Sequence, residues 1–182
     1  MKAGTILDSQ EITQHIQEIA DQIIARHGSN KEIALIGIRT CGAFLAARLR
    51  KTLVKSGVPT TPLGILDITL YRDDWTRIST IPIVGKTELS FSVDDKLLIL
   101  VDDVLYTGRT VRAAMDALMD YGRPKKIELA ILADRGAENR ELPIAPDYTG
   151  GTWTTSTEQT INVYLEEAGF EDHVAIEKKK AA

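Results

Sequence analysis

Hydrophobic residues near the start of the chain recur every three or four positions. The members of this stripe are Ile12, Ile16, Ile19, Ala20, Ile23 and Ile24. Such spacing predicts an amphipathic helix. Asp8 and Glu11 have the spacing of a capping box at its start, and Gly28 provides a stop. We therefore expect a helix between Asp8 and Gly28.

Short apolar runs and helical patterns alternate through the middle of the chain. The runs expected as strands are 33–36, 62–71, 97–101 and 127–132, and the patterns expected as helices are 42–55 and 110–121. Strands that alternate with helices in this way are typical of a parallel sheet covered on both faces. The sequence therefore predicts an α/β fold with a mostly parallel central sheet and helices on both faces.

Two stretches depart from this alternation. Residues 72–90 form a long connection without a sustained period, and such connections in a compact domain are usually lids or binding segments. Beyond Asp134 the helical patterns stop. The short strands expected there are 147–149, 161–165 and 174–176. They predict a small C-terminal flap, within about 134–177, over one edge of the sheet.

The composition is that of one globular domain. Of 182 residues, 43% are apolar and 26% are charged, which suffices to bury a core and excludes disorder as the main state. No repeat or linker divides the chain, so we expect a single domain over 1–177 and a disordered tail over 178–182. Cys41 is the only cysteine, and neither a secretory signal nor a long apolar run is present, which predicts a cytoplasmic protein.

The net charge argues against general nucleic-acid binding. The formal charge is −4, and without the lysines of the tail 19 basic residues stand against 26 acidic ones, a net charge of −7. Non-specific affinity for nucleic acid depends on neutralising phosphates with a basic surface. The composition does not provide such a surface.

The candidate chemistry lies where the strand at 97–101 meets the following helix. The strand delivers Asp102 and Asp103 at its carboxyl end, and ligands bind at this edge of open α/β sheets. Free backbone N–H groups at the helix start, with the hydroxyls of Thr107 and Thr110, predict a pocket for a phosphate. Gly108 lets the backbone approach the phosphate oxygens.

Two carboxylates beside an anion pocket need a partner other than the anion. Sugar hydroxyls or a divalent cation would suit Asp102 and Asp103, so the segment predicts a sugar phosphate with Mg²⁺. The alternative is that both acids only end a strand. Segment 37–42 has the glycine spacing of a Walker A loop but lacks the following Lys-Ser/Thr, and no dinucleotide fingerprint or zinc cluster is present in the sequence.

The segment Val101-Asp-Asp-Val-Leu-Tyr-Thr-Gly-Arg-Thr110 resembles the phosphoribosyl-pyrophosphate motif of type I phosphoribosyltransferases. Segments 66–74, 122–124, 134–136 and 140–144 extend the resemblance to the pyrimidine operon regulator and uracil phosphoribosyltransferase family. The resemblance implies a type I phosphoribosyltransferase-like fold, in which phosphoribosyl pyrophosphate, Mg²⁺ and uracil give UMP and pyrophosphate. It also implies homodimers or higher oligomers and, in many members, binding of pyr messenger RNA when UMP is bound.

The resemblance assigns expected roles around the motif. Asp102 and Asp103 would hold the ribose hydroxyls, and with Arg39 they are the expected catalytic residues. Arg39 and Thr40 match the pyrophosphate loop, in which this chain has Thr40-Cys41-Gly42 where the family has Thr-Arg-Gly. The alternative for Arg39 is a solvated loop charge. The residues expected at the 5′-phosphate are Val104, Leu105, Tyr106, Thr107, Gly108, Arg109 and Thr110.

Two further sites follow from the resemblance. The connection at 72–90 matches a mobile catalytic loop, with Arg72, Arg77 or Lys86 as candidates to close over pyrophosphate. The base is expected beneath the flap, near Arg135 and the backbone at Ile161. Arg135 could instead form only a structural ion pair.

A regulatory function is the alternative to catalysis. The positions that the family uses for RNA contact are here Gln17, Asp21, Arg140, Ala145 and Gly151. Only Arg140 keeps the family's residue type, and Asp21 adds a negative charge where a phosphate would approach. We therefore expect an enzyme with weakened RNA binding. A non-enzymatic domain with an acidic pocket would not explain the Thr-Gly-Arg-Thr segment.

Overall fold

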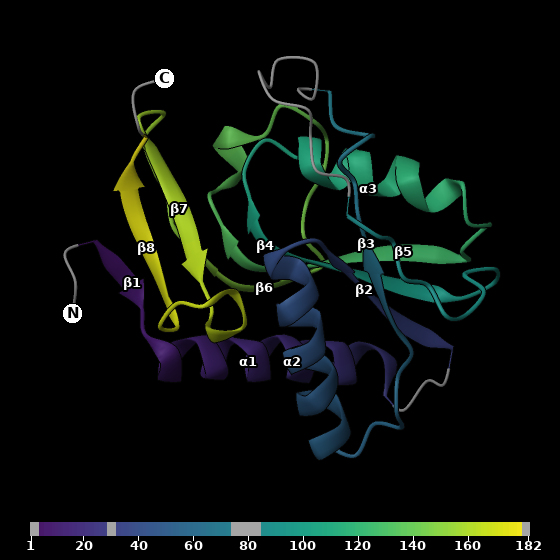
Figure 1. Cartoon of the computed structure of the whole chain (residues 1–182). Coiled ribbons are helices and arrows are strands. Elements are labelled where there is room, and N and C mark those ends of the chain that lie inside the picture. The colour runs from purple at the N-terminus through teal and green to yellow at the C-terminus, as the bar shows by residue number, and fades with distance from the viewer. Residues whose placement is uncertain (1–3, 29–31, 74–84, 180–182) are drawn as a thin grey trace.

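A five-stranded parallel sheet forms the centre of the computed structural model, which describes residues 4–28, 32–73 and 85–179 (Figure 1). Its strands, in spatial order, are β3 (Leu63–Leu66), β2 (Ile33–Ile38), β4 (Leu97–Leu105), β5 (Lys126–Asp134) and β6 (Tyr148–Thr152). All neighbouring pairs run parallel. The carboxyl ends of the five strands therefore share one edge, and the expected α/β sheet is confirmed.

Helices cover both faces of this sheet, as the sequence predicts (Figure 1). Helices α1 (Ser9–His27) and α2 (Cys41–Lys55) pack on one face, and α3 (Arg109–Met119) packs on the other. The capping box at α1 is present: Asp8 accepts from the Glu11 amide at 2.9 Å, and Glu11 accepts from the Asp8 amide at 2.8 Å. No helix of the described residues is long and apolar enough to cross a membrane.

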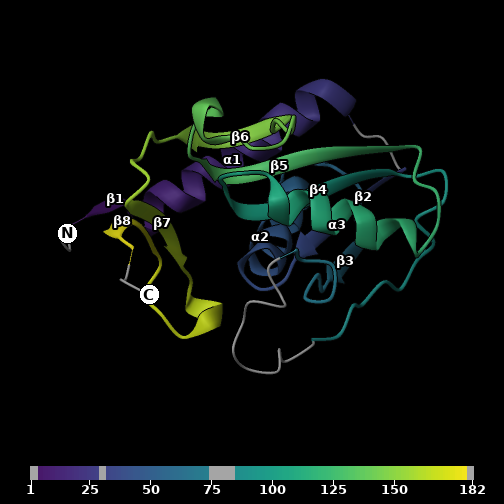
Figure 2. The same cartoon turned by 90° about the horizontal axis from the view of Figure 1, so that it is seen from above.

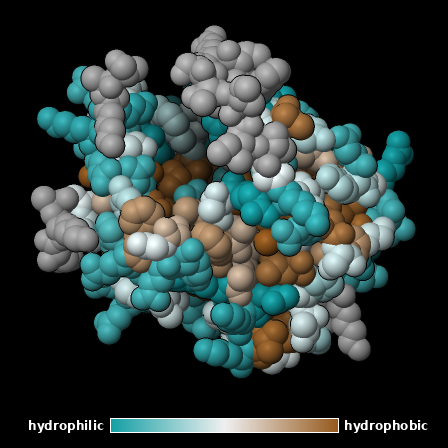
Figure 3. All heavy atoms as spheres, viewed as in Figure 1, coloured by the Kyte–Doolittle hydropathy of each residue, from teal (hydrophilic) through white to brown (hydrophobic). Residues whose placement is uncertain are grey.

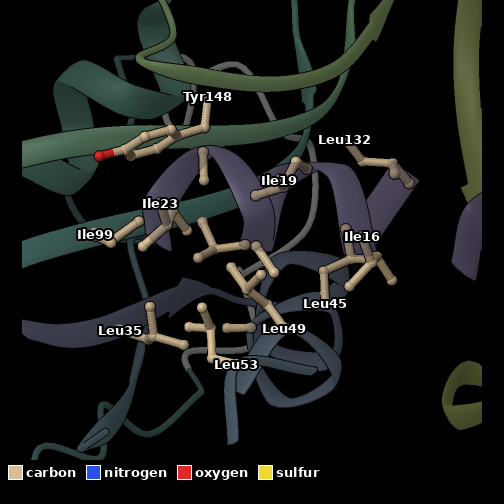
Figure 4. Close-up of a cluster of buried hydrophobic side chains, with 14 of the residues drawn as sticks. Ile16, Ile19, Ile23, Leu35, Leu45, Leu49, Leu53, Ile99, Leu132 and Tyr148 are labelled. Atoms are coloured by element: carbon tan, nitrogen blue, oxygen red, sulfur yellow. The ribbon is translucent and has the colours of Figure 1, made fainter. Parts of the chain in front are cut away.

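The larger core lies between the sheet and the two helices α1 and α2 (Figure 4). Ile16, Ile19 and Ile23 of α1 and Leu45, Leu49 and Leu53 of α2 belong to one cluster with strand residues such as Leu35, Ile99 and Leu132. All are buried. The hydrophobic stripe that predicts α1 is thus the surface it buries, and this fixes α1 and α2 on the sheet.

Two glycines let the start of α2 come unusually close to the sheet. A Cβ on Gly42 would lie 2.5 Å from the Val101 carbonyl oxygen, and one on Gly37 would lie 2.5 Å from Cα of Ala43. No larger side chain fits either position without a shift of the backbone. The N-terminus of α2 is consequently pressed against the strand that carries Asp102.

A second, antiparallel sheet stands at one end of the molecule (Figure 2). Its strands are β1 (Thr5–Leu7), β8 (His173–Lys178) and β7 (Gln159–Tyr164), in that spatial order. The short 3-10 helices η2 (Ala137–Asn139) and η3 (Glu166–Ala168) lie in the connections. We call β7, β8 and the turn between them the flap. Strand β7 is an edge strand, with β8 on one side only.

Four details of the sequence-based expectation differ. The strand expected at 62–71 ends at Leu66, and the one expected at 147–149 is β6, which joins the central sheet beside β5 and not the flap. Strand β1 is not predicted from the sequence, because its 3 residues are too few to show a pattern. Lys178 pairs with Gln159 in β8, and the Lys179 amide donates to the Glu158 carbonyl at 2.8 Å, so this part of the tail is ordered; residues 180–182 lie outside the described residues.

Candidate functional site

A cavity of about 730 Å³ opens where β4 passes into α3. Its lining consists of Arg72, Asp73, Val104, Leu105, Tyr106, Thr107, Gly108, Arg109, Thr110, Val111 and Glu141. It contains all seven residues predicted at the phosphate, together with Arg72. The sequence motif therefore becomes one continuous concave surface, which we call the motif cavity.

Gly108 shapes the floor of the motif cavity. Its φ is +91°, in the left-handed region, and it is the residue directly before α3. No side chain caps the helix start, and the first turn contains no acidic residue. The Arg109 amide donates to the Thr107 hydroxyl in a long hydrogen bond of 3.4 Å, and the helix dipole favours an anion at the N–H groups of this turn.

Arg109 lies at the rim of the motif cavity and is paired. Its guanidinium donates to Asp73 at 2.5 Å and to Glu141 at 2.6 Å, and these hydrogen bonds raise the pKa of Arg109. All three side chains are half-exposed. The positive charge of Arg109 is therefore offset by two carboxylates, and the backbone is the stronger candidate for anion binding.

A second cavity of about 570 Å³ lies between the flap and the end of β4. We call it the flap cavity. It is lined by Cys41, Asp103, Val104, Tyr106, Arg135, Thr160, Ile161, Asn162, Val163, Tyr164, Ala168 and Phe170. Seen from the side shown in Figure 3, the surface is hollowed between the flap and the rest of the molecule. Val104 and Tyr106 line both cavities, which are therefore adjacent.

The two carboxylates differ in exposure. Asp102 is buried, and the Asp103 amide donates to it at 3.0 Å; Asp103 is half-buried, accepts from the Val104 amide at 2.9 Å and lines the flap cavity. Burial raises the pKa of Asp102 well above its usual range, and the nearby Asp103 adds to this rise. Burial also raises the pKa of Asp103. Of the pair, Asp103 is the one that faces the flap cavity.

Cys41 joins α2, Asp103 and the flap. Its Sγ lies 3.8 Å from the Val163 carbonyl oxygen. Burial raises the pKa of the Cys41 thiol to about 12, and the negative charge of Asp103 contributes. The thiol is consequently protonated at neutral pH and acts as a weak donor, not as a nucleophile.

The free edge of β7 faces the flap cavity. Backbone groups in an antiparallel pair point alternately toward the partner strand and away from it. The carbonyls of Gln159 and Val163 point away from β8, because they accept from Arg135 at 2.8 Å and contact Cys41. Ile161 lies midway between them, so its N–H and C=O point in the same direction. Ile161 therefore presents one donor and one acceptor beside the flap cavity.

Arg135 ties the end of β5 to the segment before β7. Its guanidinium donates to the Thr155 hydroxyl at 2.7 Å and to the Gln159 carbonyl, and it lies 3.7 Å from the centre of the Tyr106 ring. Burial lowers the pKa of Arg135, since its described hydrogen-bond partners include no carboxylate. The alternative of an ion pair with Asp134 does not hold. Arg135 instead supports one wall of the flap cavity.

Arg39 and Lys86 line neither of the two cavities. Arg39 donates to the Lys86 carbonyl at 2.8 Å and pairs with Glu88 at 3.3 Å, so its side chain supports the segment after the long connection. Lys86 itself lines a separate groove beside β3. Thr40 is exposed directly before α2. Arg77 lies outside the described residues.

Arg140 has a structural position that the sequence does not reveal. Its guanidinium pairs with Asp134, donates to the Tyr106 carbonyl at 2.6 Å and to the Ile144 carbonyl at 3.2 Å, and its side chain is 10% exposed. Every guanidinium nitrogen of Arg140 is thus engaged within the chain, and contact of Arg140 with RNA stays a prediction. The arginine fixes the loop behind the motif cavity.

Several residues around the flap cavity were missed by sequence reasoning. Tyr164 and Phe170 contribute an aromatic wall, with ring centres 5.3 Å apart, and Arg48 of α2 anchors the turn that carries Phe170. A strand pattern at 161–165 marks Tyr164 as part of a strand but does not show that this strand forms an edge. No local pattern connects Arg48 with residues more than a hundred positions away.

Comparisons with known proteins agree on one family. The model of the phosphoribosyl transferase domain matches residues 2–167. The bifunctional protein PyrR of Pelotomaculum thermopropionicum is 50% identical over 171 residues, covering 94% of this chain and 93% of that protein. The bifunctional protein PyrR of Syntrophobacter fumaroxidans is 46% identical over 177 residues, covering 97% and 94%.

Solved structures show the same fold. A mutant of the hypoxanthine phosphoribosyltransferase of Trypanosoma cruzi, in a ternary complex with substrates, matches with a TM-score of 0.73 at 18% identity, covering 96% of this chain and 95% of that one. A hypoxanthine phosphoribosyltransferase from Staphylococcus aureus matches with a TM-score of 0.70 at 17% identity, covering 95% and 91%. At these identities the likeness concerns the fold alone.

Proposed function

Since this chain belongs to the phosphoribosyl transferase domain family and, within it, to the group of the bifunctional PyrR proteins, we propose that it converts uracil and phosphoribosyl pyrophosphate into UMP and pyrophosphate. One observation carries the proposal. A phosphate-type cavity at a helix start and a cavity with a free strand edge adjoin at Val104 and Tyr106, with Asp103 beside them.

Each part of the nucleotide has a matching chemical environment. The N–H groups at the start of α3 suit the 5′-phosphate. Asp103, where the cavities meet, suits the ribose hydroxyls, and Asp102 supports it through the bond from the Asp103 amide. Uracil carries adjacent C=O and N–H groups, which complement the N–H and C=O of Ile161. The phosphate, ribose and base would thus lie in this order from the start of α3, past Asp103, to β7.

The reaction breaks the bond between C1 of ribose and pyrophosphate and forms a bond to N1 of uracil, which loses its proton. The protonated Cys41 thiol is no nucleophile, and the residues around the two cavities bind and orient the substrates. The motif cavity fixes the 5′-phosphate, Ile161 orients the base, and the flap excludes water from one side. Such positioning accounts for a large share of the rate of group transfer between two bound substrates.

The carboxylate pair fits Mg²⁺ as a cofactor. Mg²⁺ prefers oxygen ligands and is commonly held by one or two carboxylates together with substrate phosphates. Among the described residues no group of three or more potential ligand side chains could hold a metal alone. Asp103, supported by Asp102, would supply the protein's oxygens. When bound, Mg²⁺ would stabilise negative charge on the departing pyrophosphate.

Pyrophosphate release tests the proposal. The purified chain is supplied with phosphoribosyl pyrophosphate and Mg²⁺ and offered uracil, hypoxanthine, guanine or cytosine in turn. We expect release with uracil and UMP as the product. Equal or greater release with a purine base, or release with none, would contradict the proposed substrate.

The resemblance to the pyrimidine operon regulator family, to which the PyrR relatives also point, implies a second function, UMP-dependent regulation through pyr messenger RNA, and we propose that this function is weakened in this chain. Asp21 and the engagement of Arg140 within the chain predict that RNA binding is weak at physiological salt. A gel shift of pyr leader RNA with and without UMP measures it. Submicromolar binding strengthened by UMP would refute this expectation. Oligomers, which relatives form, are proposed on the resemblance alone.

A further inference from the structure

Arg48, on the exposed side of α2, forms a dense set of hydrogen bonds to the turn between β7 and β8. Nε donates to Glu167 at 2.9 Å, Nη2 donates to Glu167 at 2.5 Å and to Asp172 at 3.0 Å, and Nη1 donates to Asp172. The Arg48 side chain is 19% exposed and that of Asp172 is 6% exposed. The pair with Asp172 is thus largely shielded from solvent, whereas Glu167 is 38% exposed; together the two pairs link α2 to the flap turn.

The anchored turn forms part of the flap cavity. Asp172 also accepts from the Glu166 amide at 2.8 Å, which closes the turn upon itself. Ala168 and Phe170, between the two acids, line the cavity. Arg48 lines neither of the two cavities. It therefore acts on the cavity only through the turn.

The strand that faces the base is held at both of its ends. Arg135 binds the Gln159 carbonyl where β7 begins, and Arg48 holds the turn that follows Tyr164, where β7 ends. Ile161 lies between these two attachments. Loss of Arg48 would release the end that carries Phe170, whereas Arg135 would still hold the other end.

We propose that Arg48 is a positioning residue for the base: by fixing the turn of residues 166–172, it sets the width of the flap cavity and thereby the affinity for the base. This proposal rests on the proposed function. It assigns no contact between Arg48 and the substrate. The proposal predicts an effect on the flap cavity alone, because the motif cavity contains no residue of the flap.

The choice of arginine is what makes the substitution informative. The planar guanidinium can serve both oxygens of Glu167 and both of Asp172, whereas a lysine ammonium is a compact charge without that fork. Arg48→Lys therefore keeps the charge and most of the aliphatic stem but removes the fixed geometry. A loss of base affinity in this variant would come from position and not from charge.

The test compares UMP with ribose 5-phosphate, which lacks only the base. Calorimetry on the full chain gives both dissociation constants. The dissociation constant of ribose 5-phosphate divided by that of UMP, which we call the UMP ratio, measures what the base contributes to affinity. We expect Arg48→Lys to reduce this ratio about tenfold, on the order of the loss of one hydrogen bond to a charged group, with ribose 5-phosphate affinity unchanged. In turnover, KM for uracil should rise by about the same factor while kcat and KM for phosphoribosyl pyrophosphate stay within about twofold.

Arg26→Lys is the matched control. Arg26 also joins a helix to a loop carboxylate, since it donates to Asp147 at 2.9 Å, but it lies on α1 and lines neither cavity. Its variant should lose stability at most and keep the UMP ratio. If both variants changed the ratio equally, or if Arg48→Lys weakened ribose 5-phosphate as much as UMP, the proposal would be overturned.

A milder variant keeps the test usable if Arg48→Lys does not fold. Glu167→Gln removes one of the two charges that hold Arg48 and should reduce the ratio about threefold, because Asp172 still anchors the turn. An unchanged ratio in that variant would count against the proposal. The two claims fail separately: a wild-type chain that binds UMP but makes none from uracil refutes the proposed function, whereas the ratio still decides on Arg48. A chain on which the base adds nothing to ribose 5-phosphate affinity refutes both.

Discussion

Glu128 is a buried acid at the edge of the sheet opposite the two cavities. It lies near the start of β5, and its side chain is fully buried. It contacts His27 Nε2 at 2.7 Å and Lys126 Nζ at 2.6 Å, and it accepts from the Tyr148 hydroxyl at 2.5 Å. Burial alone would raise its pKa, but these hydrogen bonds outweigh burial and lower the pKa of Glu128 to about 2. The ionised form therefore joins α1, β5 and β6.

The size of this effect follows from the pKa. The fall from the ordinary value of 4.5 to about 2 corresponds to about 3 kcal/mol at neutral pH. Lys126 is half-exposed, so solvent screens part of its attraction, and we take about 2 kcal/mol as the stability that depends on the charge. We expect Glu128→Gln, which keeps the shape and removes the charge, to lower the free energy of unfolding by this amount at pH 7.

The stabilisation by ionised Glu128 depends on pH in a definite direction. Because the pKa is lower in the folded state, the stabilisation is fully present above about pH 4.5 and is lost as the pH falls through about 2. Urea unfolding of both proteins at several pH values measures it. The difference between wild type and Glu128→Gln should be about 2 kcal/mol at pH 7 and should shrink between pH 4.5 and pH 2.

Two results would refute this reasoning about Glu128. One is equal stability of the two proteins at pH 7, and the other is a difference that does not change with pH. Glu32→Gln serves as the control, because Glu32 is 63% exposed and lies 3.8 Å from Lys125. An exposed pair of this kind contributes about 0.5 kcal/mol or less, so the control should match wild type throughout.

Three further predictions concern the site and its support. Asp103→Asn should lower UMP formation about 100-fold or more while the circular dichroism spectrum stays that of wild type; undiminished turnover would remove Asp103 from the site. Gly42→Ala should lower the free energy of unfolding by about 1–3 kcal/mol, measured by thermal unfolding, because its Cβ would lie 2.5 Å from the Val101 carbonyl oxygen. An unchanged Tm would show that the backbone shifts to accommodate the Cβ without loss of stability. Arg140→Gln should cost about 3–5 kcal/mol in urea unfolding, because it leaves the carboxylate of Asp134 without its cation, and a loss below about 1 kcal/mol would contradict the structural role.

Local patterns account for the parts of the fold that the sequence predicts well. The capping box at Asp8 and the isoleucine stripe each involve residues three or four positions apart, and both are present as expected. The strand that carries Asp102 and the helix that follows also appear where the apolar run and Gly108 indicate. These features depend on neighbouring residues, so a single sequence contains the necessary information.

Edges and long-range pairs depend on information that the local sequence lacks. Strand β6 looks like part of the flap because it follows the last helix, yet it pairs with β5, and Gln22 of α1 donates to its Thr149 carbonyl at 3.0 Å. The direction of an arginine side chain is equally hidden. Arg39 donates to the Lys86 carbonyl and Arg140 to the Tyr106 carbonyl, and in both cases the acceptor lies far from the arginine in the sequence.

The acidic character of the chain bears directly on how a phosphorylated ligand could bind. The formal net charge is −4, so the field of the whole molecule does not attract a polyanion. The charge of Arg109 is offset by Asp73 and Glu141. Helices α2 and α3, however, both begin at the carboxyl edge of the sheet without an acidic residue in the first turn or a side-chain cap.

Backbone N–H groups, beside Arg72 and the hydroxyls of Thr107 and Thr110, are therefore candidate donors for phosphate, and a parallel sheet places several helix starts along one edge. An uncharged base needs a different surface, and the antiparallel flap provides it as the unpaired edge of β7. Each sheet thus suits one half of a nucleotide. Their relative position is set by the contacts of Cys41, Arg48 and Arg135 with the flap, so substitutions at these contacts should alter base affinity before they alter phosphate affinity.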